Sequence, residues 1–270
     1  SQLIQGVGYS PDLVWIKSRG AADVHGLFDT VRGASKVISS NSTVSESTEA
    51  DQQTSFDTDG FSLSTSHSVN KPSTSFVAWT WDMGGSTVSN TSGNVTSNVR
   101  ANSAYGQSIV SWTGNSTGGA SVGHGLSSSP EFIIIKNRTS SNTQWRIQDT
   151  LSNKRFIFDT DAGSTGYRIT FSSSTFTFDS DSGGHTDWNG NSNEMIAYCF
   201  HSVAGYSKFG SYTGSGSSGN SVTTGFRPAF VMIKQTNASG ENWGIVDSTR
   251  NPTNPINEAL FADSSAAVST

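Results

Sequence analysis

The sequence is poor in the residues that build covalent or charged scaffolds. Its single cysteine, Cys199, cannot form a disulfide within the chain, which excludes a disulfide framework. Cys199 lies in the apolar run 195–200 and is predicted to be a small buried hydrophobe. No apolar stretch approaches the ~20 residues that a membrane-spanning helix needs, so we expect no membrane partner.

Charge is equally scarce. Only 14% of residues are charged, and the formal net charge is -5. Because phosphate binding requires clustered lysine and arginine side chains, this composition excludes a nucleic-acid partner.

Large aromatic side chains and glycine are plentiful by contrast. The hydrophobic fraction is only 33%, yet it includes 7 Trp, 15 Phe and 6 Tyr, and 28 glycines supply turns. Aromatic residues in such numbers predict a folded core, and a surface of Ser, Thr, Asn and Gly is typical of a β-rich extracellular protein.

One pattern occurs three times: a proline, one further residue, four apolar residues and a lysine. The three segments are GYSPDLVWIKSRG (8–20), LSSSPEFIIIKNRTS (126–140) and GFRPAFVMIKQTNAS (225–239). Pro11, Pro130 and Pro228 begin the pattern, and Lys17, Lys136 and Lys234 end it. Such self-similarity predicts tandem structural units.

Further blocks recur in the same order. An Asp followed by Thr or Ser stands downstream of each lysine, at Asp29, Asp149 and Asp247. SIVSWTGNSTGG (108–119) pairs with SKFGSYTGSGSSG (207–219), and FVAWTWDMGG (76–85) pairs with MIAYCFHSVAG (195–205). We therefore predict repeat 1 at 1–88, a linker at 89–104, repeat 2 at 105–205 and a partial repeat 3 at 206–270. The first strand is expected to be missing from repeat 1 and the last strands from repeat 3, as in a piece of a longer array.

The local patterns predict an all-β protein. Four apolar residues in a row indicate a strand that is covered on both faces, and a proline before it fits a strand start. Elsewhere apolar and polar residues alternate, as in half-buried strands. We expect tandem antiparallel β-sandwich repeats of jelly-roll type.

The blocks GYSPDLVWIKSRG, FDTVRG, TSFDTDGFSL and FVAWTWDMGG resemble a repeat of the structural, tail-fibre-like proteins of marine tailed phages. The resemblance covers nearly the whole chain, although copies two and three lack the FDTVRG block. It implies a concanavalin-like sandwich, a virion location, other virion proteins as partners and a trimeric homo-oligomer. It also implies a tail fibre or similar appendage that contributes to attachment to a host, with a host surface glycan as a further partner. The alternatives are an architectural decoration or spacer of the head or tail, a secreted lectin-like module, and a polysaccharide-cleaving enzyme.

No catalytic, cofactor or metal site is predicted. The recurring carboxylates Asp29, Asp149 and Asp247 are typical of turn residues that bond nearby backbone N–H groups, rather than of a glycosidase pair. The pairs Asp57/Asp59 and Asp179/Asp181 resemble the start of a calcium loop but lack a later acidic ligand at a shared offset.

Two features admit two interpretations each. Lys17, Lys136 and Lys234 either extend an ammonium group from the sheet edge into water or contact a receptor. The loop 180–194 places Trp188 among Asp187, Asn189 and Asn191, with His185 nearby. If exposed, Trp188 suits stacking on a sugar ring; alternatively, it folds back onto its own domain.

Overall fold

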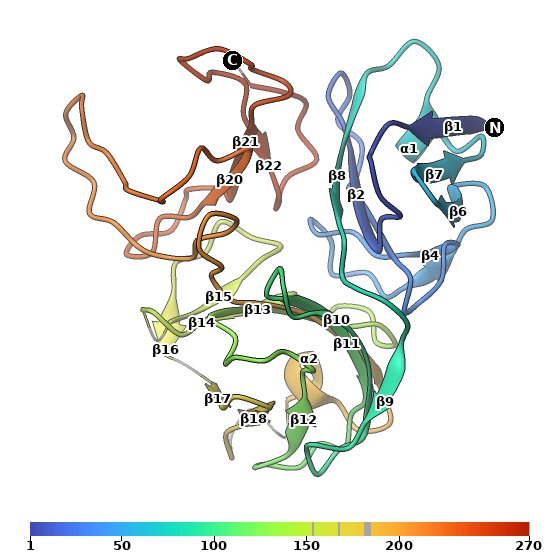
Figure 1. The fold of residues 1–270 in the computed structure, drawn as a ribbon, viewed down its shortest axis with the longest axis vertical. Coiled ribbons are helices and arrows are strands. Elements are labelled where there is room, and N and C mark those ends of the chain that lie inside the picture. The colour runs from blue at the N-terminus through green and yellow to red at the C-terminus, as the bar shows by residue number, and fades with distance from the viewer. Residues whose placement is uncertain (153, 167, 181–184, 270) are drawn as a thin grey trace.

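The computed structural model describes residues 1–152, 154–166, 168–180 and 185–269 (Figure 1). The all-β expectation is confirmed, because every pairing between named strands is antiparallel. The described residues contain two helices, α1 (His67–Asn70) and α2 (Thr186–Asn189), of four residues each. Neither is long enough to cross a membrane.

Figure 1 shows three lobes around a common centre, blue, green to yellow, and orange to red in chain order. We call them copy one, copy two and copy three, after the repeats that they contain. The boundaries of the repeats as domains stay a prediction.

Copy one contains two three-stranded sheets in the orders β3-β2-β8 and β1-β7-β6, and a small pair β4-β5. Its strands are β1 (Gln2–Gln5), β2 (Leu13–Ser18), β3 (Gly26–Asp29), β4 (Lys36–Val37), β5 (Ser47–Thr48), β6 (Gln53–Asp57), β7 (Gly60–Leu63) and β8 (Phe76–Trp81).

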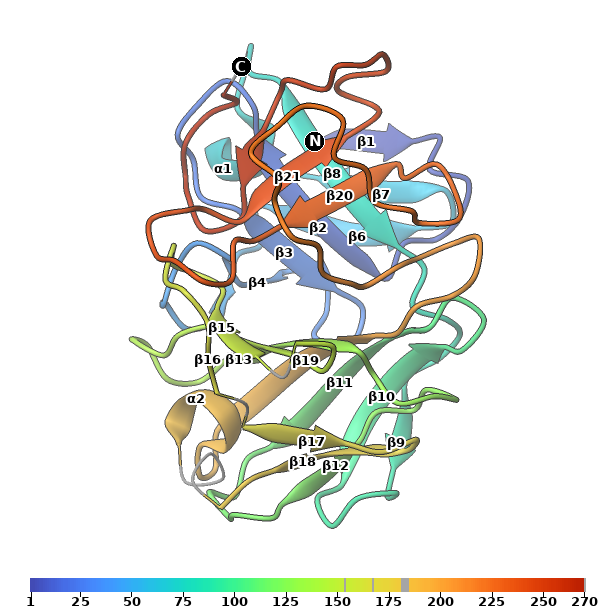
Figure 2. The same cartoon turned by 90° about the vertical axis from the view of Figure 1, so that its left-hand side faces the viewer.

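Copy two repeats this plan with more strands. An eight-stranded sheet in the order β16-β15-β14-β13-β19-β11-β10-β9 faces a three-stranded sheet β12-β18-β17, and Figure 2 shows the two layers. The strands are β9 (Val88–Asn90), β10 (Ser97–Asn102), β11 (Gln107–Thr113), β12 (Ser121–Gly123), β13 (Phe132–Asn137), β14 (Arg146–Asp149), β15 (Lys154–Ile157), β16 (Thr165–Gly166), β17 (Ile169–Phe171), β18 (Thr175–Phe178) and β19 (Glu194–Phe200).

The linker predicted at 89–104 is wrong. β10 pairs with β11 over six residues, and β9 pairs with β10, so the segment forms the edge of the large sheet. Val95 and Val99 are buried in the core of copy two. A sequence rich in Ser, Thr and Asn can form such an edge because the ladder bonds come from the backbone, while a few apolar residues anchor one face.

Copy three contains one sheet, β20-β21-β22, within the described residues. Its strands are β20 (Phe230–Ile233), β21 (Gly244–Asp247) and β22 (Leu260–Phe261).

The recurring apolar strands β2, β13 and β20 each begin two residues after Pro11, Pro130 or Pro228. Alternate residues of β2 and β13 enter different cores, as covering on both faces predicts. Val14 and Ile16 pack inside copy one, and Ile133 and Ile135 pack inside copy two. The residues between them, such as Trp15, join one core that draws on all three copies, which we call the shared core. The second covering layer is therefore supplied by the other repeats.

Candidate functional site

The three copies are joined at one recurring position, the residue directly before the strand that follows the apolar strand along the chain, namely β3, β14 or β21. Trp145 of copy two donates from Nε1 to the carbonyl of Ser39 in copy one at 2.8 Å. Trp243 of copy three donates to the carbonyl of Ile157 in copy two at 3.3 Å. In copy one the position holds His25, whose Nε2 lies 3.0 Å from the carbonyl of Phe261 in copy three.

The three acceptors are also equivalent. Ile157 and Phe261 pair with the first residues of β14 and β21, and Ser39 follows Ile38, which pairs with Leu27 of β3. Each copy therefore bonds the same place in the next one, from copy two to copy one, from copy one to copy three, and from copy three to copy two. The contacts close a ring with approximate threefold symmetry around the shared core.

The ring fixes the protonation state of His25. Trp15 donates from Nε1 to Nδ1 of His25 at 2.7 Å, so Nδ1 accepts and Nε2 carries the proton. Burial, together with the nearby charge of Lys17, lowers the pKa of His25 to about 3. The imidazole is therefore a neutral structural link.

The recurring Asp residues hold turns in all three copies. Asp29 Oδ1 accepts from the backbone N–H of Val31 and of Arg32 at 3.1 and 2.9 Å. Asp247 accepts in the same way from residues 249 and 250, and Asp149 from residues 151 and 152. These bonds satisfy backbone donors that the turn leaves unpaired.

Two of these carboxylates also accept a bond from a neighbouring copy. The Tyr198 hydroxyl of copy two donates to Asp29 Oδ2 of copy one at 2.8 Å, and Trp79 Nε1 of copy one donates to Asp247 Oδ2 of copy three at 3.1 Å. The donors are equivalent: Tyr198 pairs with Ile134 in the β13–β19 ladder, and Trp79 with Trp15 in the β2–β8 ladder.

Each of these two carboxylates, Asp29 and Asp247, also pairs with an arginine three residues further along the chain. Arg32 Nε lies 2.5 Å from Asp29 Oδ2, and Arg250 Nε lies 2.6 Å from Asp247 Oδ2, with all four side chains almost fully buried. The guanidinium of Arg250 also stacks over the Trp79 ring. Burial by itself would raise the pKa of Asp247, but the hydrogen bonds from Arg250 and Trp79 lower it.

Asp149 differs from its two counterparts. It is half-buried, Ser152 occupies the place of the arginine with its hydroxyl 2.5 Å from Oδ2, and within the described ranges no side chain of another copy donates to it. The aromatic donor that reaches Asp29 and Asp247 from a neighbouring copy therefore has no counterpart at Asp149 among the described residues, at the junction of copies two and three.

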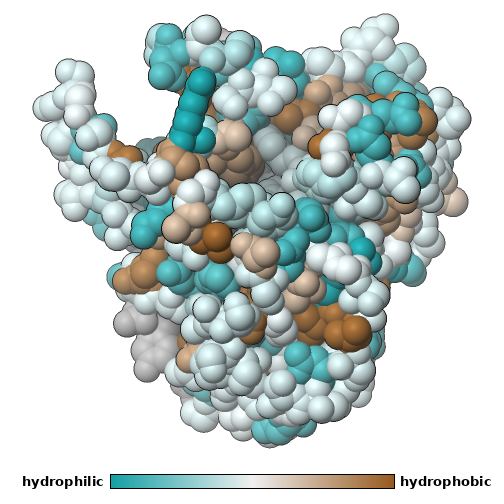
Figure 3. Space-filling view, in the orientation of Figure 1, coloured by the Kyte–Doolittle hydropathy of each residue, from teal (hydrophilic) through white to brown (hydrophobic). Residues whose placement is uncertain are grey.

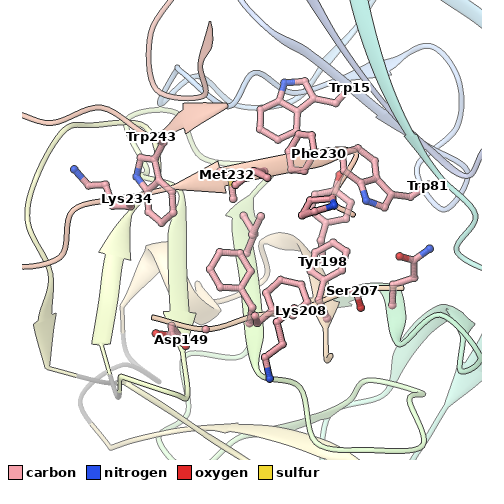
Figure 4. Close-up of a pocket in the computed structure, with 18 of the residues that line it drawn as sticks. Trp15, Trp81, Asp149, Tyr198, Ser207, Lys208, Phe230, Met232, Lys234 and Trp243 are labelled. Atoms are coloured by element: carbon pink, nitrogen blue, oxygen red, sulfur yellow. The ribbon is translucent and has the colours of Figure 1, made fainter. Parts of the chain in front are cut away.

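A cavity of about 540 Å³ lies at this open position. We call it the central groove. One wall consists of residues 207–210, the other includes residues 230–232 of β20, and Asp149 lies at one end. Figure 4 shows Phe230, Met232, Tyr198 and Trp243 around it, and Figure 3 shows the hollow between the lobes.

The recurring lysines do not extend into water as expected of a sheet-edge residue. Lys17 and Lys136 are fully buried. Lys17 Nζ donates to the carbonyls of Ser18 and of Ser265 in copy three at 2.8 and 3.0 Å, and Lys136 Nζ donates to Thr143 at 2.6 Å. Lys234, which is half-buried, donates to Asp161 of copy two at 2.9 Å. Backbone carbonyl oxygens, some from nearby residues and some from another copy, take the place of water around the amines. Burial lowers the pKa of Lys17 and Lys136 to about 8.

The structure also decides between the two interpretations of the loop around Trp188. An exposed Trp188 is wrong, because the side chain is 1% exposed and packs in the core of copy two, leaving no face for a sugar. Asp187 forms an ion pair with Arg146, and Asn189 is buried and accepts from Trp112 Nε1 at 3.1 Å. His185 and Asn191 are exposed and Asp187 is half-buried, so the part of these three residues in glycan binding stays a prediction.

Sequence reasoning missed a pair of exposed aromatic residues. Tyr105 and Tyr206 stack with ring centroids 4.6 Å apart, are 39% and 43% exposed, and line the central groove. Both stand just before the paired blocks 108–119 and 207–219, which is the signal that could have found them.

Asp57 and Asp59, which resemble the start of a calcium loop, accept hydrogen bonds within copy one. Asp59 accepts from the backbone of Gly6 and Gly8, and Asp57 accepts from the hydroxyls of Ser55 and Ser62. Asp181 lies outside the described residues. Among the residues that the structure describes, no three His, Cys, Asp or Glu side chains gather in a way that could hold a metal ion.

The chain belongs to a family described as a domain of unknown function, DUF7483, whose model matches residues 1–270. No curated protein and no solved structure is significantly similar to it.

Proposed function

We propose that the chain is a structural module of a tailed-phage particle, part of a tail fibre or a similar surface appendage that contributes to host attachment. The observation that supports a mechanical role is the ring of contacts that joins the three copies. Trp145, Trp243 and His25 each bond the next copy, and buried Asp–Arg pairs reinforce two of the junctions.

Such a ring suits a part that transmits force. If one copy separated from the others, apolar surface of the shared core would be exposed and the buried polar groups of the cross-copy bonds would lose their partners. The resemblance of the motifs supports the virion location, and a trimeric assembly, if formed, multiplies weak contacts with a host through avidity.

The location can be tested by immunogold electron microscopy, with antibodies against this chain, of phage particles whose genome encodes it. We expect gold on the tail or a tail appendage. Gold on the head or tail tube would favour an architectural decoration instead. Absence from particles, with the chain in the medium as a free protein, would overturn the proposal and favour a secreted lectin-like module.

The attachment part is tested with the exposed tyrosine pair. Stacked exposed aromatic rings offer faces that suit sugar rings. We expect the double variant Tyr105→Ala/Tyr206→Ala to bind host cells or extracted surface glycans at least fivefold more weakly than the parent. Tyr212→Ala, which removes an exposed tyrosine that does not line the central groove, is the matched control. Equal binding by all three proteins would remove the pair from the proposal.

A further inference from the structure

One edge of copy two is polar where the matching edge of copy one is apolar. Phe28 of β3 and Val37 of β4 pack in the core of copy one. The ladder registers make Gln148 of β14 and Arg155 of β15 their counterparts, and these two residues pair with each other in copy two. Because copy one folds with apolar side chains at these positions, the fold of the repeat does not require an arginine there.

Gln148 lies at the centre of three arginines. Arg155 stands directly opposite it in the β14–β15 ladder, and Arg146, two residues before it, shares its face of β14. Gln148 Oε1 accepts from the backbone N–H of Arg168 at 2.9 Å, which brings the third arginine to the same edge. We call Arg146, Arg155 and Arg168 the arginine cluster. All three are partly exposed, and Figure 2 shows this edge of copy two, with β15, β16 and α2.

Acidic side chains lie beside two members of the cluster. Arg146 forms an ion pair with Asp187 of α2, with 3.0 Å between Nε and Oδ2, and Arg168 Nη1 lies 3.7 Å from Asp179 Oδ2. Like charges at neighbouring positions of a sheet repel one another. Three guanidinium groups around one glutamine therefore favour further negative charge at this edge.

Arg155 has donors to offer to such a charge. Its Nε donates to the hydroxyl of Thr165 at 2.5 Å, while Nη1 and Nη2 have no partner among the residues that the structure describes. Burial, together with the nearby positive charges of Arg168 and Arg146, lowers the pKa of Arg155. A bound anion relieves this repulsion, and the paired N–H groups of a guanidinium match two oxygens of a carboxylate or sulfate.

We propose that the arginine cluster binds the carboxylate or sulfate groups of an acidic polysaccharide on the host surface, with Arg155 in contact with the anion. This inference rests on the proposed attachment function and names the chemistry of its ligand. A net charge of -5 disfavours a polymer with a phosphate on every unit. A chain of sugars, in which anionic groups recur among neutral hydroxyls, suits the site because the exposed Thr165 lies beside Arg155 and can bond a sugar hydroxyl.

The probes are fluorescent oligosaccharides of hyaluronan, which carry carboxylates, and of κ-carrageenan, which carry sulfates. Each is titrated into the intact chain and followed by anisotropy, with neutral dextran oligosaccharides as the control ligand. We expect saturable binding of at least one acidic probe and none of dextran. The stronger of the two acidic probes identifies the preferred anion.

Three variants of the chain test the role of Arg155. Arg155→Val introduces the residue that copy one has at this position, so the strand should form, and we expect the acidic probe to bind about tenfold more weakly. Arg155→Lys keeps the charge but loses the fork of donors, and we expect a loss of about threefold. Arg227→Val is the matched control, because it removes an exposed arginine of copy three, and we expect affinity within about twofold of the parent.

Phenylglyoxal, which modifies arginine side chains, locates the site by mass spectrometry. We expect the acidic probe to slow modification of Arg155 and to leave that of Arg227 unchanged. Equal binding by the parent and Arg155→Val would overturn the inference, and so would an equal loss in Arg227→Val. Absence of binding of both acidic probes to the folded parent would also overturn it.

Titration with glycans extracted from host cells separates this inference from the proposed function. If the parent and Arg155→Val bind the extract equally well, the attachment function stands and the arginine cluster is not its site. If the parent binds an acidic probe through Arg155 but does not bind the extract or host cells, the anion site stands and the attachment function is overturned.

Discussion

At the junction of copies one and two, Asp29 is fully buried, pairs with Arg32 and accepts the Tyr198 hydroxyl. At the junction of copies two and three, its counterpart Asp149 is half-buried, has Ser152 beside it and faces a groove. The same position of the repeat is thus a structural link in one place and an open site in the other. The difference depends on whether a neighbouring strand covers the carboxylate.

Replacing the two carboxylates separately provides the largest test of this comparison. Asp29→Ala removes the buried carboxylate that pairs with Arg32 Nε and accepts the Tyr198 hydroxyl, and leaves Glu46 as the acidic partner of the guanidinium. We expect a loss of about 3–5 kcal/mol of unfolding free energy. Asp149→Ala loses only turn bonds, and we expect about 1 kcal/mol. Denaturant unfolding measures both. Equal losses would show that the two positions do not differ as described.

Acid should weaken the ring at His25. The pKa of His25 is about 3 in the folded chain and close to its ordinary value of 6.5 in the unfolded chain, so the unfolded state binds the extra proton. The stability that depends on the neutral imidazole is complete above pH 6.5 and is lost as the pH falls toward 3. We expect a loss of about 3 kcal/mol between pH 7 and pH 4 from this group.

The control for this pH dependence is His25→Gln, whose amide can accept from Trp15 and donate to a carbonyl without titrating. Carboxylates titrate in both proteins, so the difference between their pH profiles isolates His25. Parallel profiles would contradict the assignment of a neutral imidazole.

Removing a single hydroxyl tests the cross-copy donor. Tyr198→Phe keeps the ring in the shared core but removes the bond to Asp29, and we expect a loss of about 1–2 kcal/mol. Tyr212→Phe changes an exposed hydroxyl and should leave stability unchanged within about 0.5 kcal/mol. Thermal and denaturant unfolding of the two variants would make the comparison.

The smallest expected loss of stability comes from removing one of the hydrogen bonds that join the three copies in a ring. Trp145→Phe and Trp243→Phe each remove one bond across a junction, and we expect similar losses of about 1 kcal/mol each from the missing bond. A much larger loss for Trp145→Phe would mean that the junction of copies two and three contributes less than its counterpart at copies one and two.

The repeat and the all-β class could be predicted from the sequence because they depend on local patterns. The four apolar residues after Pro11 and Pro130 do form strands with both faces covered. What covers the second face could not be predicted, because the partners come from copies distant in the sequence.

The same limit explains the errors. A lysine at the end of an apolar strand ordinarily reaches water, but one of the carbonyls that accept from Lys17 belongs to Ser265 of copy three, which is distant in the sequence. Trp188 stands in a polar stretch, yet a short helix turns its ring into the core of copy two. The ring of cross-copy bonds could be inferred from the sequence only in part, because a Trp precedes the strand in copies two and three (β14 and β21) but His25 precedes β3 in copy one.

The buried cysteine gives the molecule an internal reporter. Cys199 is fully enclosed in β19, and burial raises the pKa of its thiol well above the ordinary value. Thiol reagents need both access and a thiolate, so they modify this residue only when the core of copy two opens. The rate of labelling in unmodified protein therefore measures how often the central repeat opens, without an added probe.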